Sequence, residues 1–186
     1  MMRKMLLTLT ILLAASAIYA APPAEKDWRA DVASEMPLLG HRNWILIVDS
    51  AYPLEVSPGI ETIETGAPQL EVARFVLGAI EASAHVTPDI YMDSELPFVS
   101  EEDAPDASAY RRAASDLLHS YQVISEPHEK LLARIADAGN TFHVLVLKTN
   151  GTIPYSSIFI RLDCKYWSND AEQRLRARMA GHTGKQ

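Results

Sequence analysis

The sequence lacks most of the motifs by which enzymes are recognised from their residues alone. It has one cysteine, Cys164, in 186 residues, which excludes an intrachain disulfide and a zinc site built from several cysteines. No Walker loop, Rossmann glycine fingerprint, nucleophile elbow or two-histidine zinc helix is present. What remains for chemistry is a small number of acidic, basic and polar side chains near the ends of the expected strands and helices.

The chain also lacks a basic cluster. Its formal net charge is -7, and an acidic protein without such a cluster is repelled by the phosphate backbone, so no nucleic-acid partner is expected. Acidic residues concentrate in the stretch 93–106, which also holds Pro97 and Pro105. We expect a solvated loop there. The alternative, a calcium loop, is disfavoured because the oxygen-ligand spacing of a recognised site is absent.

Residues 1–20 have the pattern of an export leader. Arg3 and Lys4 give a positive start, and the apolar run that follows is short for a membrane span. Cleavage is expected after Ala20, with Ala17 as the competing site and a retained anchor as the other alternative. Without Arg3 and Lys4 the net charge moves from -7 to about -9. The mature chain is thus expected to be periplasmic or secreted, with no stable membrane span.

The rest of the chain alternates between strand and helix patterns, which predicts one α/β layered domain with a mostly parallel sheet flanked by helices. Residues 21–29 are expected to be a linker, 30–167 the domain, and 168–186 a charged C-terminal helix or tail. The expected strands are 44–48, 60–63, 86–92, 121–124, 141–148 and 157–162. The expected helices are 25–39, 68–83, 107–120, 127–138 and 170–179.

Three groups stand where a site could form. His41 precedes the apolar strand 44–48 and Asp49 follows it, at the strand end where ligands gather in α/β proteins. His128 begins a helix, and Tyr155 and Ser157 belong to a turn before the last strand. Each also has a simpler explanation: a surface or capping histidine, an aspartate that caps a turn, and a core tyrosine whose hydroxyl is satisfied. Spacing alone leaves the function undecided.

At these residues the sequence resembles the RbsD/FucU family of D-ribose pyranases and L-fucose mutarotases. The likeness covers roughly residues 30–165 and rests on three motifs: Gly40-His41 with Asp49 and Pro53, His128-Glu129 at a helix start, and the segment 149–157 with its Pro154-Tyr155. The sequence departs from the family pattern at three positions. Asn150 and Gly151 stand where the family has Gly-Glu, and Ser157 stands where it has Asn.

The resemblance implies an isomerase that interconverts monosaccharide anomers or ring forms without a cofactor or metal. His41 would be the general acid/base, and Asp49, His128, Tyr155 and Ser157 would bind a ribose- or fucose-like sugar. One alternative is a non-catalytic monosaccharide-binding oligomer of the same fold, which the loss of the family's Glu and Asn favours. Another is a structural oligomer in which His41 and Asp49 lie in a subunit contact.

Geometry limits how His41 and Asp49 meet. Eight residue steps of extended chain span about 26 Å at roughly 3.3 Å each, so one extended segment cannot bring both side chains to one sugar. Either the chain curls at Arg42-Asn43, or a neighbouring subunit completes the site. The family's ring-shaped assemblies, with sites between adjacent subunits, fit the second option, so a homo-oligomer is expected.

Overall fold

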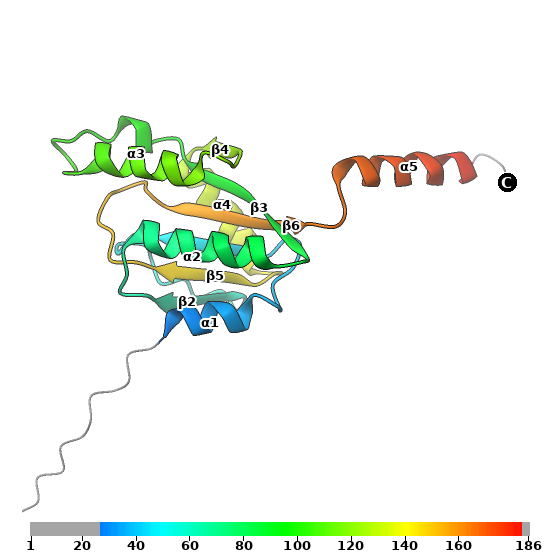
Figure 1. The fold of residues 1–186 in the computed structure, drawn as a ribbon, viewed down its shortest axis with the longest axis horizontal. Helices are drawn as coiled ribbons and strands as arrows, with labels where there is room; N and C mark the ends of the chain where they lie inside the picture. Colours follow the sequence, from blue (N-terminus) through cyan, green and yellow to red (C-terminus); the bar gives the residue numbers. More distant parts are fainter. Residues whose placement is uncertain (1–26, 184–186) are drawn as a thin grey trace, which may run out of the picture.

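The computed structural model describes residues 27–183 (Figure 1). The expected leader, residues 1–20, lies outside this range, as does the linker up to residue 26. Within the described part of the chain, no helix combines the length and the apolar composition that crossing a membrane requires.

A six-stranded sheet forms the centre of the molecule, in the order β2-β5-β1-β6-β3-β4. All neighbouring pairs are parallel except those of β6, which runs antiparallel to both β1 and β3. The prediction of an α/β domain with a mostly parallel sheet is therefore confirmed. The strands are β1 Trp44–Val48, β2 Ile60–Glu64, β3 Val86–Asp93, β4 Val123–Glu126, β5 Val144–Lys148 and β6 Ile158–Cys164.

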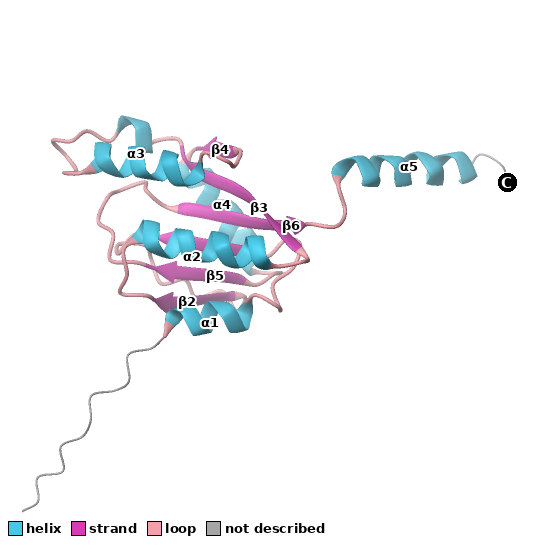
Figure 2. Cartoon of the chain, in the orientation of Figure 1, coloured by secondary structure: helices cyan, strands magenta, loops and turns pink. Residues whose placement is uncertain are grey.

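Helices cover both faces of the sheet (Figure 2). α1 and α2 pack on one face and α4 on the other, while α5 projects away from the body. The expected terminal helix is present and somewhat longer than predicted. The helices are α1 Trp28–Glu35, α2 Gln69–Ala82, α3 Ala107–Leu118, α4 His128–Gly139 and α5 Asn169–Thr183, with a short 3₁₀ turn, η1, at Leu96–Phe98.

The central strand β1 is apolar throughout because both of its faces are covered. Ile45 and Ile47 pack into the core under α1 and α2, and Trp44, Leu46 and Val48 pack into the core under α4. All five side chains are buried. Polar residues can therefore stand only at the two ends of the strand, where His41 and Asp49 are found.

The acidic stretch 93–106 is not the uniformly solvated loop that its composition predicts. Asp93 is the last residue of β3 and is only 2% exposed, and Leu96 in η1 is also buried. The remaining acidic residues of the stretch, such as Glu101 and Asp103, do lie at the surface. One carboxylate of this stretch thus belongs to the interior, beside the site described next.

Candidate functional site

A cleft of about 600 Å³ lies at the edge of the sheet where β1, β3, β4 and β5 end. Three segments that are far apart in the sequence form it: the loop after β1, the first turn of α4 and the turn before β6. This is the edge at which α/β proteins bind ligands. The lining residues are Asp49, Ser50, Ala51, Tyr52, Pro53, His128, Glu129, Leu132, Thr152, Pro154 and Tyr155.

His128 is held in the cleft from several sides. Its Nδ1 lies 3.1 Å from Oδ1 of the buried Asp93. Its backbone N–H donates to the carboxylate of Glu95, with Oε1 at 3.0 Å, which caps the start of α4. The edge of one ring meets the face of the other between His128 and Tyr155, with ring centroids 5.3 Å apart and planes at 88°. His128 and Tyr155 therefore act as one wall of the cleft.

Burial raises the pKa of Asp93 to about 6, because the charged carboxylate is removed from water. His128 opposes this rise in pKa, and the nearby carboxylates of Glu95 and Asp49 add to it. An acid that titrates close to neutrality thus lies next to His128, which lines the cleft. Perturbed acids of this kind, beside a histidine and in a cleft, are typical of functional sites.

Asp49 lies at the rim of the cleft. Its Oδ1 accepts a hydrogen bond from the backbone N–H of Ala51 at 2.8 Å, which fixes the side chain in a tight turn. Tyr52, three residues on, donates its hydroxyl to Oε1 of Glu55 at 2.7 Å. Both the simple explanation, a turn cap, and the functional one therefore fit Asp49, since the cap also orients it toward the cleft.

The turn that carries Tyr155 is strained and strongly anchored. Tyr155 adopts a left-handed backbone conformation with φ of 57°, which is costly for a residue other than glycine. The next residue, Ser156, is completely buried, and its carbonyl accepts hydrogen bonds from Gln69 Nε2 at 2.8 Å and from the Tyr110 hydroxyl at 2.7 Å. Gln69 Nε2 also donates to the carbonyl of Ile47 in β1, at 3.2 Å. This network ties the turn to the central strand.

Replacing Gln69 with Leu is expected to lower the free energy of unfolding by about 2 kcal/mol, because it leaves buried carbonyl groups short of a donor. Tyr110→Phe removes one hydrogen bond from the same carbonyl and is expected to cost about 1 kcal/mol. Urea denaturation measures both. Equal costs for the two variants would contradict the central place of Gln69 in this network.

Of the five residues predicted for the site, the structure brings Asp49, His128 and Tyr155 into one cleft. Ser157 is 1% exposed and is not among the residues that line it. His41 is not there either. It lies before β1, at the opposite end of the strand from Asp49, and Arg42 turns the chain there with φ of 77° without bringing His41 to the cleft.

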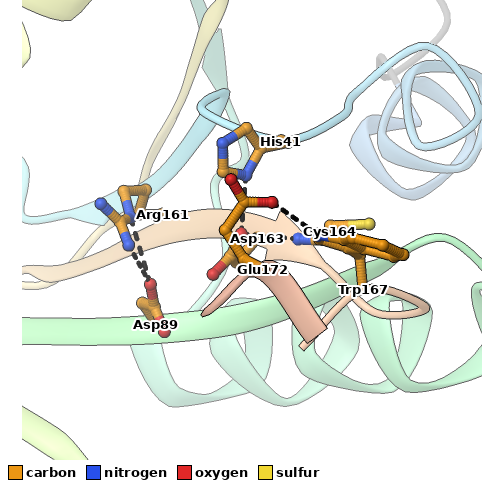
Figure 3. A network of polar contacts seen from close by, with 7 residues as sticks. All are labelled: His41, Asp89, Arg161, Asp163, Cys164, Trp167 and Glu172. Atoms are coloured by element: carbon orange, nitrogen blue, oxygen red, sulfur yellow. Dashed lines mark hydrogen bonds and ion pairs between the residues drawn. The ribbon is translucent and has the colours of Figure 1, made fainter. Parts of the chain in front are cut away.

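His41 instead pairs with the end of β6 (Figure 3). Its Nδ1 lies 2.6 Å from Oδ1 of Asp163, which also accepts the backbone N–H of Cys164 at 2.7 Å. Burial opposes ionisation of Asp163, but these hydrogen bonds hold its pKa below the usual range. The His41 side chain is half exposed and faces a second hollow of about 610 Å³ beside Trp167 and Glu172.

Sequence reasoning missed Asp93. The signal was present, since Asp93 directly follows the apolar residues Ile90–Met92 of one strand as Asp49 follows those of another. Within residues 27–183, no three Asp, Glu, His or Cys side chains are grouped as the ligands of a metal ion would be.

Comparison with solved structures identifies the fold. Bacillus subtilis RbsD complexed with D-ribose matches with a TM-score of 0.51 and 14% identity, over 72% of this chain and 92% of that one. FucU from Bifidobacterium longum matches with a TM-score of 0.50 and 12% identity, over 72% and 94%. The chain has the RbsD/FucU fold. The fold that the sequence resemblance implied is thus confirmed.

A further structure with this fold is the fucose mutarotase from Streptococcus pneumoniae in complex with L-fucose, at a TM-score of 0.49 and 17% identity, over 72% of this chain and 91% of that one. No protein-family model and no curated protein matches the sequence. The RbsD/FucU likeness is therefore one of fold.

Proposed function

We propose that this chain is a monosaccharide isomerase of the mutarotase or pyranase type. The observation that carries the proposal is the meeting of Asp49, His128 and Tyr155 in one cleft. They are three of the five residues for which the sequence resembles the RbsD/FucU family. The B. subtilis protein of this fold is complexed with D-ribose, which supports a sugar as the ligand. A cleft of about 600 Å³ also suits a small polar molecule.

The residue types fit the chemistry. Exchange between anomers or ring forms requires that a proton leave the anomeric hydroxyl and another reach the ring oxygen, and closure reverses both steps. An imidazole can both give and take a proton, and this is the role proposed for His128. The carboxylate of Asp49 accepts hydrogen bonds from sugar hydroxyls, and the Tyr155 hydroxyl supplies a further contact. These steps use no covalent intermediate.

The second proton-transfer group in this proposal is His41 of a neighbouring copy. Within one protomer His41 lies at the far end of β1 from the cleft, yet its side chain is half exposed and lies in a hollow of its own. A homo-oligomer that sets this hollow against the cleft of the next copy would complete the site with two histidines. Ring opening needs both an acid and a base, so such a site is better equipped than either half.

Export is also part of the proposal, on the leader pattern of residues 1–20. N-terminal sequencing of the chain recovered from outside the cytoplasm of an expressing bacterium is expected to begin at Ala21. A sequence beginning at Met1 in the cytoplasmic fraction alone would contradict export.

Exchange NMR on a panel of monosaccharides, including ribose and fucose, tests the isomerase function. The wild-type protein is expected to speed the exchange between anomers or ring forms of at least one sugar. Binding without faster exchange would instead support a non-catalytic sugar-binding protein. One observation favours that alternative: Ser157, at a position where the family has Asn, is buried away from the cleft. A protein that neither binds a sugar nor speeds its exchange would overturn both functions.

A further inference from the structure

Asp93 is buried in a way that stability alone does not explain. The residue is 2% exposed, and within residues 27–183 its carboxylate oxygens have no polar partner other than the imidazole of His128. Its ion pair within residues 27–183 is the one with Nδ1 of His128, at 3.1 Å. A carboxylate buried with so few partners is costly to the fold, so its place behind a histidine that lines the cleft calls for a functional reason.

The rest of the contacts fix His128 rather than Asp93. The Glu95 carboxylate holds the backbone N–H of His128, and the Tyr155 ring packs against the imidazole. Nδ1 is itself buried, whereas the ring lines the cleft. Since the two nitrogens lie on different sides of the ring, Nε2 is the one left to meet a ligand.

We propose that Asp93 is the proton partner of His128: it holds the proton on Nδ1 and so leaves Nε2 to exchange protons with the molecule in the cleft. Asp93 acts through His128 and is a positioning residue. A carboxylate that fixes the tautomer of a histidine in this way also stabilises the imidazolium that forms during proton transfer. That the molecule in the cleft is a sugar rests on the proposed function, whereas the pairing of Asp93 with His128 does not.

Several titratable groups face Asp93 and His128. The carboxylate of Asp49 and the neutral hydroxyl of Tyr52 lie in the loop after β1, and the carboxylate of Glu95 lies in the segment after β3. Glu126 is the cross-strand neighbour of Asp93 on β4, but it is ion-paired with Arg134 at 2.9 Å. The uncompensated charges near Asp93 are thus mostly negative, which agrees with a carboxyl that takes up a proton near pH 6.

The sign of the effect on stability follows from this raised pKa. A carboxyl that binds its proton more tightly when folded stabilises the protein below its ordinary pKa, and this stabilisation is lost as the pH rises through about 6. Asp93→Asn is therefore expected to raise Tm by about 2–4 °C at pH 8 and to bring no gain at pH 4. A carboxylate kept for stability would show the opposite, a lower Tm at pH 8.

The decisive experiment follows the imidazole ¹⁵N shifts of His128 with pH. In the wild-type protein they are expected to show a proton on Nδ1 and an inflection that reports the titration of the neighbouring Asp93 carboxyl near pH 6. In Asp93→Asn the inflection should disappear or move by at least about half a pH unit. Asp89→Asn is the matched control, because Asp89 lies on the same strand but pairs with Arg161, and it should leave the shifts unchanged.

Each outcome decides something different. A wild-type His128 with its proton on Nε2, or a titration that is the same in Asp93→Asn, would overturn the inference, and the wild-type spectrum gives this answer even if the variant does not fold. A coupled pair in a protein that speeds no sugar exchange would support the inference and overturn the proposed function. With activity present, the acid limb of the pH–rate profile should move in Asp93→Asn and not in Asp89→Asn.

Discussion

Chains carrying His41→Ala, assembled with chains carrying Asp49→Ala, are expected to regain about a quarter of the wild-type exchange rate, although each variant alone is nearly inactive. The reason lies in how the proposed site is divided. If His41 comes from one copy and Asp49 from its neighbour, random mixing leaves some sites with both residues intact. A site contained in one protomer would have no such route to recovery.

Within one protomer, the central strand β1 separates the two residues of the proposed site. β1 has five buried residues, with Asp49 after one end and His41 before the other. Asp49 turns into the cleft at one end, and His41 pairs with Asp163 at the other. A rigid strand with both faces packed cannot shorten to bring these ends together, so only another copy can supply His41 to the cleft.

A second mixture is the matched control. His128 and Asp49 line the cleft of the same protomer, so assembling His128→Ala chains with Asp49→Ala chains should restore nothing. Recovery in this control mixture would show that one site takes Asp49 and His128 from different copies, which would contradict the cleft described above. No recovery in the His41 mixture, with mixed oligomers confirmed by native mass spectrometry, would remove His41 from the site.

The sequence predicted the fold well because the periodic pattern and the packing agree. The run Trp44–Val48 was predicted as a buried strand, and β1 has these bounds because helices cover both of its faces. Agreement was poorer where the pattern was weak. The fourth strand was expected at 121–124 but runs Val123–Glu126, at the edge of the sheet, where burial of side chains is incomplete.

The site was harder to predict because it depends on how distant segments pack. The contact between His128 and Tyr155 joins the start of α4 to a left-handed turn, and no local pattern fixes their relative position. Asp93 was assigned by composition to an acidic loop, whereas its environment is set by the strand that precedes it. For His41 and Asp49, the length of an extended chain left two arrangements open, a curl at Arg42-Asn43 or a neighbouring subunit, and only the structure shows that the two residues stay apart within one protomer.

His128→Ala is expected to lower kcat for sugar exchange by about 10²–10⁴-fold while changing KM little, because a proton-transfer group acts mainly in the transition state. Removal of a group that only binds the sugar would raise KM and leave kcat near its wild-type value. Saturation kinetics by exchange NMR separate the two. His119→Ala is the control, since His119 is an exposed histidine of the segment after α3, bonded to the carbonyl of Asp116.

Imidazole added to the His128→Ala protein gives a sharper form of the same test. The missing ring leaves a space beside Asp93 and Tyr155, and free imidazole of the same shape is expected to restore part of the rate. Rescue should rise with the concentration of the base and should weaken when Asp93 is also replaced by Asn, because the proton partner is then gone. A rate that imidazole leaves unchanged, with KM raised instead of kcat lowered, would make His128 a sugar contact and leave the chemistry to another group.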